Sequence, residues 1–374
     1  MATLEKIIIR NFRNISFAEL SFSAGVNCIC GKNGQGKTNL LDAIHYLSLT
    51  RSAFASSDSF CYRHGCDAFS IAGTYRMQDG LSSRFVVNVE NGVKTVKRDD
   101  KVYPKVSAHI GTLPVVMVSP QDSTLVSESG DERRRFANCV LSQLSAEYLA
   151  ATSRYNKLLA QRNKILKDYK PDISLLDVLD TQMGECAAVI VPSRIKFADM
   201  LCKAVAGHYA ALSGESESIA VSYRSGIPVS FKSDVCSAGD VAASFAAALK
   251  SSLEKDLILK YTSTGVQRDD FLFEMDGYPI RKCGSQGQQK SFLVALKLAQ
   301  YDIMNASYGF PPILLLDDVF DKLDEGRIAN LLKIVNSTDY GQIFITDTHR
   351  ERMERIVGGI ARDVKFFNAE NGEF

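Results

Sequence analysis

Eight consecutive residues match the phosphate-binding pattern G-x-x-x-x-G-K-[ST] at every fixed position. Before them, residues 26–30 are typical of a short buried strand, and after them residues 39–47 space their apolar side chains like a helix. Strand, glycine-rich loop and helix therefore follow one another in the order that a phosphate-binding loop needs. The eight residues of the loop are Gly31, Lys32, Asn33, Gly34, Gln35, Gly36, Lys37 and Thr38.

The residue types in this loop indicate how a triphosphate would bind. Glycines let successive backbone N–H groups curl around phosphate oxygens, and the N-terminus of the following helix adds partial positive charge. Lys37 can reach the β and γ phosphates, and the Thr38 hydroxyl can ligate Mg²⁺. We therefore expect a site for a nucleoside triphosphate with Mg²⁺.

A second apolar strand, residues 313–316, ends in the adjacent carboxylates Asp317 and Asp318. An ordinary core strand is the simpler alternative. Burying a carboxylate is costly unless it meets a cation, so paired acids at the end of this strand favour a metal site. We expect Asp317 to hold Mg²⁺, and Asp318 to stand where an attacking water needs a base or an orienting acceptor.

A small, glycine-bearing turn precedes the helix-like stretch 291–300. Ser285, Gly287 and Gln288 in this turn can form a second anion site, because the N-terminus of a helix attracts negative charge. The alternative is an ordinary loop with good capping residues.

Composition narrows the class of protein. The chain has 374 residues, 45% of them hydrophobic, which is enough for two domains or for one large domain with an insertion. Its net charge of +1 means that any contact with nucleic acid must come from a local patch. An odd number of scattered cysteines and the lack of a signal-peptide pattern favour a reducing cytoplasm, and no apolar run is long enough to span a membrane.

Periodicity predicts a sheet-rich beginning followed by long helices. Strands are predicted within 4–22 and at 69–75 and 84–89. From Leu141 to Tyr169 an apolar heptad stripe, broken only by Arg162, predicts one long amphipathic helix. A turn at 170–172 and a second helical stretch at 174–212 complete an antiparallel hairpin. The hairpin can be a short projecting arm, or its apolar stripe can be ordinary core packing within a helical lobe; the periodicity is the same in both cases.

The order of the motifs resembles that of ABC-type ATPases, in which two head domains bind ATP between them and each signature turn faces the phosphate of the other subunit. By this resemblance residues 285–289 are the signature, and residues 321–324 occupy the place of the D-loop. Gln121, which follows a predicted strand at 115–118, matches the Q-loop residue that senses Mg²⁺ and the γ-phosphate; the alternative is an ordinary turn residue. Either Asp347, by spacing, or His349, by chemistry, fits the switch position.

A long insertion separates the two halves of this head, and it resembles the SMC family of chromosome and repair ATPases. Further segments resemble the RecF family of bacterial recombination mediators, with departures at 265–267, at Lys290 and near Gln121. These segments are 11–14, 31–39 with 41–44, 119–122, 133–136, 265–270, 285–289, and 317–319 with 323–324.

The resemblance implies an α/β fold: an ABC-type P-loop ATPase head, with a mixed sheet flanked by helices, and an inserted helical, SMC-like arm lobe. We expect residues 1–129 to form the N-terminal part of the head, 130–255 the inserted lobe, and 256–374 the C-terminal part of the head.

The same resemblance implies a cytoplasmic ATPase that acts mainly as a switch in DNA replication, repair, recombination and the SOS response. Two copies would join on ATP, sit on DNA at single-strand gaps and on duplex at gap junctions, and cooperate with RecR and RecO in loading RecA. Hydrolysis would be slow and stimulated by DNA. Two alternatives are the ATPase subunit of a transporter and a P-loop kinase acting on a small molecule.

Basic residues in and after residues 133–135 are candidates for DNA contacts, because a run of cations on a helix can follow a phosphate backbone. The alternative is that they form an ordinary solvated helix face. The candidates are Arg133, Arg134, Arg135, Arg154, Lys157, Arg162, Lys164 and Lys167.

Overall fold

The structure of the chain is a computed structural model. In the part of the chain that it describes, no helix is long and apolar enough to cross a membrane. The described residues are 2–128, 130–214, 217–227, 238–320, 325–336, 340–358 and 363–374.

The chain forms two compact units. The first contains residues 1–123, 208–215 and 285–374, and the second contains residues 124–207 and 216–284. Residues 256–284, which we expected in the head, lie in the second unit. Strand pairing is the physical reason, because β10 (Asp270–Met275) pairs antiparallel with β9 (Ile219–Arg224).

The first unit contains a five-stranded parallel sheet in the order β14-β3-β13-β12-β8. All residues of β3, β8, β12 and β13 are buried, which explains why these strands are mostly continuous apolar runs. Because the strands are parallel, their carboxyl ends meet at one edge of the sheet. The strands are β3 (Val26–Cys30), β8 (Val115–Val118), β12 (Ile313–Leu316), β13 (Ile343–Asp347) and β14 (Val364–Asn368).

Helices and short 3-10 turns connect the strands of the first unit. The loop after β3 leads directly into α1, which is the predicted helix after the phosphate-binding pattern. The elements are η1 (Asp58–Cys61), η2 (Val106–Ala108), η3 (Pro120–Ser123), α1 (Lys37–Leu49), α8 (Gln286–Tyr308), α9 (Glu325–Val335) and α10 (Arg350–Val357).

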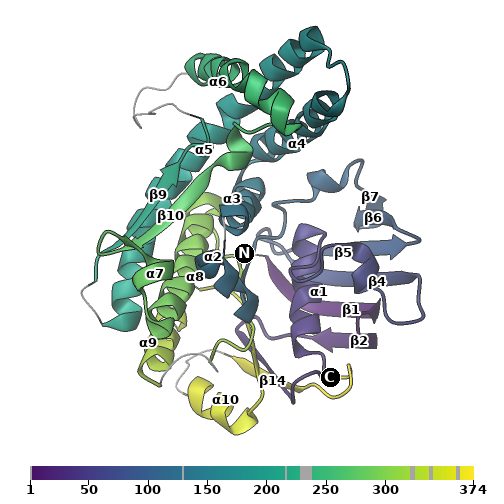
Figure 1. Cartoon of the computed structure of the whole chain (residues 1–374). Coiled ribbons are helices and arrows are strands. Elements are labelled where there is room, and N and C mark those ends of the chain that lie inside the picture. Colours follow the sequence, from purple (N-terminus) through teal and green to yellow (C-terminus); the bar gives the residue numbers. More distant parts are fainter. Residues whose placement is uncertain are drawn as a thin grey trace. The chain divides into compact units, whose positions relative to one another are not determined.

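A second, antiparallel sheet in the first unit has the strand order β2-β1-β4-β5-β6-β7, and α1 lies across one of its faces (Figure 1). The strands predicted within 4–22 and at 69–75 and 84–89 are thereby confirmed. The six strands are β1 (Thr3–Phe12), β2 (Ile15–Ser21), β4 (Ala68–Arg76), β5 (Ser82–Glu90), β6 (Val93–Arg98) and β7 (Lys101–Val102).

The second unit is mainly helical and carries a three-stranded sheet in the order β11-β10-β9. The turn predicted at 170–172 separates α4 from α5, as expected. The remaining elements are α2 (Thr124–Ser127), α3 (Gly130–Leu144), α4 (Ala146–Lys167), α5 (Ile173–Ser213), α6 (Ala238–Leu259), η4 (Val266–Arg268), β11 (Tyr278–Pro279) and α7 (Ile280–Cys283).

The predicted single helix from Leu141 to Tyr169 is wrong, because the heptad stripe runs through two helices. Ser145 has an extended backbone between α3 and α4, and its side chain accepts a hydrogen bond from the Tyr148 N–H at 3.1 Å. A serine cap of this kind begins a new helix even though the apolar spacing continues across it. Tyr169, the last member of the stripe, lies beyond α4 and is 95% exposed.

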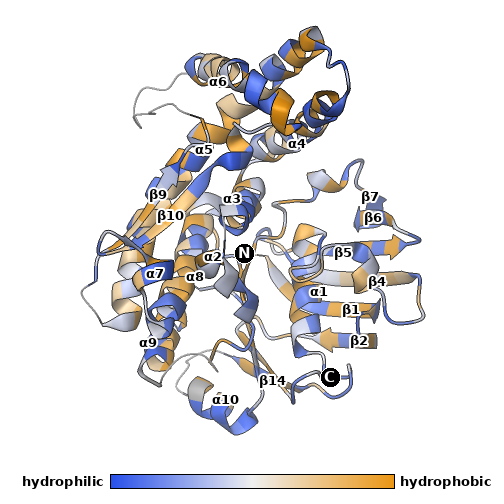
Figure 2. Ribbon diagram, viewed as in Figure 1, coloured by the Kyte–Doolittle hydropathy of each residue, from blue (hydrophilic) through white to orange (hydrophobic). Residues whose placement is uncertain are grey.

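The inward face of α4 belongs to the core of the second unit. Tyr148, Tyr155 and Leu158 are buried, and the Tyr155 ring contacts Phe245 of α6 with the ring centroids 6.0 Å apart. Figure 2 shows both hydrophobic and hydrophilic residues along α4, as its amphipathic sequence requires. The heptad stripe on this helix therefore packs within its own unit.

Two of the residues predicted to contact DNA, Arg133 and Arg162, are buried, and the prediction is wrong for both. Arg162 is fully buried, with its guanidinium 2.6 Å from Asp180 and 2.7 Å from Asp256. Arg133 lies 2.9 Å from Asp270. Their positive charges neutralise buried carboxylates, so they are not available to phosphates at the surface.

Replacing Arg162 with alanine would leave the carboxylates of Asp180 and Asp256 buried without their cation. We expect Arg162→Ala to lower the free energy of unfolding by about 3–5 kcal/mol, measured by urea titration with far-ultraviolet circular dichroism. The control is Arg154→Ala on the same helix, where the side chain is 52% exposed beside Glu185. That change should cost less than about 1 kcal/mol, and equal losses in the two variants would contradict the buried network.

Candidate nucleotide-binding site

Residues 31–36 form a tight loop between β3 and α1, and Lys37 and Thr38 are the first two residues of α1. Gly34 and Gly36 have positive φ angles of 80° and 107°, a region that glycine enters without steric cost. Gly36 is also the N-cap of α1 and has no side chain with which to cap the first N–H groups of the helix. The backbone at the start of α1 thus has the form of an anion site.

Lys37, which begins α1 directly after this loop, is almost fully buried, at 4% exposure. Its ammonium donates hydrogen bonds to the carbonyl oxygens of Gly31 at 2.7 Å and Lys32 at 3.2 Å. The cation is thereby held against the loop whose backbone would surround the phosphates.

Thr38 and Asp317 meet at the carboxyl edge of the parallel sheet. The Thr38 hydroxyl lies 3.0 Å from each carboxylate oxygen of Asp317, which is only 2% exposed. Thr346 of β13 donates a further hydrogen bond to Asp317 at 2.8 Å. A hydroxyl beside a buried carboxylate supplies the oxygen ligands that Mg²⁺ prefers, so these residues fit the metal expected from the sequence.

Burial raises the pKa of Asp317 to about 6, and the hydrogen bonds from Thr346 and Thr38 and the charge of Lys37 act in the opposite direction. The negative charge of the adjacent Asp318 adds to the rise. The site therefore carries a carboxylate whose ionised form gains from a nearby cation.

Asp318 follows β12 in a left-handed conformation with φ 45°, which is uncommon for a residue with a side chain. Its N–H donates to the Thr346 hydroxyl at 2.9 Å. Thr346 thus contacts both acids of the pair, the first through its proton and the second through its oxygen. Sequence reasoning missed this residue, although its place one position before Asp347 at the end of a buried strand was a usable signal.

Gln121 is exposed and lies in η3, which follows β8. Its neighbour Asp122 fixes this turn by accepting a hydrogen bond from the Ser119 N–H at 2.7 Å and by pairing with Lys297 of α8 at 2.7 Å. Because β8 is parallel to β12, the turn begins at the edge of the sheet where Asp317 lies.

The two candidates for the switch position have different surroundings. Asp347 is buried and pairs with Arg352 of α10 at 2.7 Å, and it also accepts a hydrogen bond from the His349 N–H at 2.7 Å. The side chain of His349 is exposed at the N-terminus of α10. Sequence reasoning missed Arg352. This residue lies on α10, and its ion pair with Asp347 at the end of β13 is seen only in the folded structure.

The signature turn begins α8 and is exposed at Ser285. The Ser285 hydroxyl accepts from the Gln288 N–H at 3.2 Å, and the Ser285 N–H donates to the Gln288 side chain at 2.8 Å, which makes a complete capping box. A Cβ added at Gly287 would lie 2.7 Å from the Arg327 guanidinium of α9. Arg327 was another residue that sequence reasoning missed. The predicted D-loop at 321–324 lies outside the described residues.

Because Mg²⁺ binds an ionised carboxylate, its affinity for the site should fall as the pH drops through about 6, the pKa of Asp317. Thr346→Val removes a hydrogen bond that lowers this pKa, so the midpoint of the loss should move to higher pH. Calorimetric titration with Mg²⁺ and nucleotide across this pH range measures the shift. Thr95→Val, on β6 of the same unit, is the control that corrects for titration of the nucleotide itself; identical midpoints in the two variants would refute the prediction.

Comparison with known proteins places this site in a family context. A family model described as an AAA domain matches residues 6–183. "DNA replication and repair protein RecF" of Porphyromonas gingivalis is 40% identical over 375 residues, which cover 99% of each chain. A solved structure of the recombination mediator protein RecF with ATP has a TM-score of 0.88 and 29% identity, covering 99% of this chain and 98% of that one.

The head domain of Smc from Pyrococcus furiosus shares the fold, with a TM-score of 0.57 at 14% identity over 100% of this chain and 95% of that one. This likeness confirms the expected fold of the head. Because the identity to the curated relative extends over nearly the whole of both sequences, the chain belongs to the RecF family of DNA replication and repair proteins.

Proposed function

We propose that this protein is an ATP-driven switch in DNA repair, in which two copies join around ATP and separate after hydrolysis. The protein is a P-loop ATPase, and ATP is its nucleotide. The approach of Thr38 to Asp317, at 3.0 Å, is the observation that carries the assignment, because it joins the phosphate loop to the acid that follows β12. Relatives that match from end to end disfavour the transporter subunit and the small-molecule kinase.

Residues 31–38 would surround the triphosphate through backbone N–H groups, with the Lys37 ammonium placed on the β and γ phosphates. Thr38 and Asp317 would hold Mg²⁺, which supplies neutralisation of the phosphate charge. Asp318 would orient the attacking water and accept its proton, and Gln121 would contact the metal from the turn after β8.

We assign the switch position to His349 rather than to Asp347. The carboxylate of Asp347 is already engaged by Arg352 and by the His349 N–H, whereas the His349 imidazole is exposed. A histidine there can donate a hydrogen bond to the γ-phosphate, and this bond ends when hydrolysis removes the phosphate.

The partner's phosphate would bind at Ser285 and Gly287. Ser285 is exposed at the N-terminus of α8, which has 23 residues, so the turn can accept a phosphate from outside its own chain. ATP bound between two copies lowers the free energy of the dimer only as long as the γ-phosphate is present.

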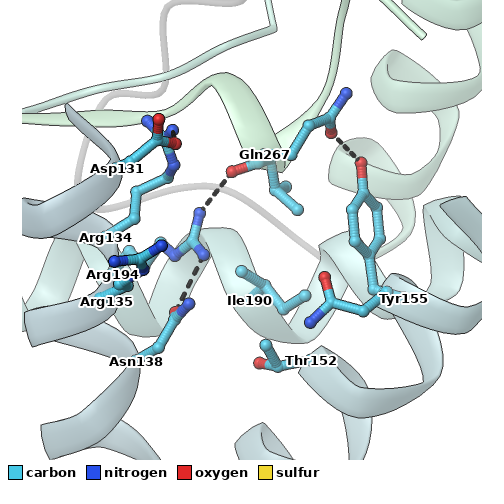
Figure 3. Close-up of a pocket in the computed structure, with 11 residues that line it drawn as sticks. Asp131, Arg134, Arg135, Asn138, Thr152, Tyr155, Ile190, Arg194 and Gln267 are labelled. Atoms are coloured by element: carbon cyan, nitrogen blue, oxygen red, sulfur yellow. Dashed lines mark hydrogen bonds and ion pairs between the residues drawn. The ribbon is translucent and has the colours of Figure 1, made fainter. Parts of the chain in front are cut away.

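DNA would contact the second unit. The exposed candidates are Arg135 on α3 and four residues of α4. The three lysines among them lie away from buried Tyr155 and Leu158, whereas Arg154, four residues before Leu158, lies beside that buried face. Arg135 also lines a pocket with Arg134, Arg194 and Asn138, whose side chains come from α3 and α5 (Figure 3). Inside this pocket Arg194 donates to the Val266 carbonyl at 2.7 Å and to Asn138 at 3.0 Å. The four residues of α4 are Arg154, Lys157, Lys164 and Lys167.

We further propose that the protein acts in the cytoplasm at single-strand gaps and duplex junctions, with RecR and RecO as partners in loading RecA. Support comes from the relatives, one of which is named as the recombination mediator of the RecFOR pathway.

The nucleotide-dependent dimer can be tested with two variants of the site. Lys37→Arg should weaken ATP binding or turnover, because the larger guanidinium does not fit the buried position of the ammonium. Asp318→Asn should leave ATP binding intact and prolong the dimer, because the attacking water loses its base. Light scattering with and without ATP measures the mass, and a mass independent of nucleotide in wild type and both variants would exclude the switch.

The DNA face can be tested by charge reversal. Lys157→Glu combined with Lys164→Glu should weaken binding to all DNA sequences alike, because phosphate contacts carry no sequence information. The slope of log affinity against log salt should become shallower by about one for each phosphate that the variant no longer neutralises. Lys203→Glu, at an exposed position on α5 of the same unit, is the control, and an unchanged slope in the double variant would remove α4 from the interface.

A further inference from the structure

A turn at residues 369–373 packs against the outer side of the phosphate-binding loop. The Gly372 N–H donates to the Gln35 carbonyl at 2.9 Å, and the Asn371 N–H donates to the Gln35 side chain at 2.5 Å. The Ala369 N–H donates to the Cys30 carbonyl at 2.7 Å. The turn itself is closed by two backbone hydrogen bonds of 2.9 Å between Glu370 and Glu373.

The fit between this turn and the loop is close enough to require glycine on both sides. A Cβ at Gly31 would lie 2.4 Å from the Ala369 carbonyl oxygen. A Cβ at Gly372, where φ is +83°, would lie 2.5 Å from the carbonyl oxygen of Asn14. Gly372 is therefore confined between Gln35 and Asn14, and neither of these contacts is with a movable side-chain end.

Asn14 supports the same loop from the turn between β1 and β2. Its side-chain oxygen accepts a hydrogen bond from Asn39 of α1 at 2.7 Å, and it would lie 3.0 Å from a Cβ at Gly36. The phosphate-binding loop thus packs against Asn14 and against the turn 369–373.

The hydrogen bond from Gly372 fixes the direction of the peptide group between Gln35 and Gly36. The Gln35 carbonyl points outward to Gly372, and in a planar trans peptide the following N–H, that of Gly36, points the opposite way. Phosphate binding needs such N–H groups to be oriented in advance, because each glycine that must be ordered on binding lowers the affinity.

We propose that the turn 369–373, together with Gln35, is a positioning element that orients the phosphate-binding loop for ATP. No residue of the turn 369–373 needs to touch the nucleotide, since the turn acts through the backbone of Gln35 and Gly36. The inference rests on the proposed function, because it assumes that ATP binds to residues 31–38.

Gly372→Ala is the test, because the added methyl group must push the turn away from Asn14 and Gln35. We expect an ATP dissociation constant about tenfold higher, and a KM raised in proportion while kcat at saturating ATP is kept. The control is Gly80→Ala in the turn between β4 and β5, where φ is +79° and no atom lies within 4 Å of the new Cβ. This control carries the same backbone strain, so its melting temperature and ATP affinity separate strain from positioning.

Gln35→Met is a second variant, which keeps the length of the side chain and removes its acceptor for Asn371. It should raise the dissociation constant about threefold with an unchanged melting temperature, and it remains informative if Gly372→Ala does not fold. Wild-type affinity in Gln35→Met together with wild-type affinity in any folded Gly372→Ala would overturn the positioning role while leaving ATP binding intact. Failure of the wild-type protein to bind ATP would instead overturn the proposed function.

Discussion

The candidate nucleotide site is built around the buried carboxylate of Asp317, and burying this charge is costly. This acid stands at the end of a strand whose every residue is buried, and burial raises its pKa to about 6. Two hydroxyls, from Thr38 and Thr346, approach it within 3.0 Å, yet neither supplies a positive charge. A bound cation would remove this cost, and it would link the proposed metal site to the phosphate-binding loop.

Parallel strand order is what brings these groups together. The phosphate-binding loop follows β3, Asp317 follows β12, and Asp347 ends β13, which pairs with both of those strands. Residues almost three hundred positions apart in the sequence thereby meet at one edge. The second unit uses charge differently, because Arg133, Arg162 and Arg194 neutralise buried aspartates. Arg133 thereby joins α3 to β10, and Arg162 joins α4 to α5 and α6.

Sequence reasoning succeeded where the chemistry is local. The phosphate-binding loop and the strand before Asp317 are each contained in a short run of residues, so spacing alone predicted them. The helix predicted at 291–300 is also present, although α8 begins earlier, at Gln286, because Ser285 caps it. Sequence reasoning failed where long-range packing decides. Arg162 interrupts an apolar stripe and has the pattern of a surface cation, but its partners lie on other helices. The hydrogen bond between Gln35 and Gly372 joins distant segments, and no pattern in either one indicated the other.

We propose that each copy completes the other's ATP site with its signature turn. Mixing two inactive variants, Lys37→Ala and Ser285→Arg, and following ATP turnover tests it most directly. Each variant alone should be inactive, and the mixture should recover turnover, because a hybrid dimer contains one pocket with an intact phosphate-binding loop and an intact signature turn. A mixture as inactive as its components, or full activity of Ser285→Arg alone, would contradict the shared site.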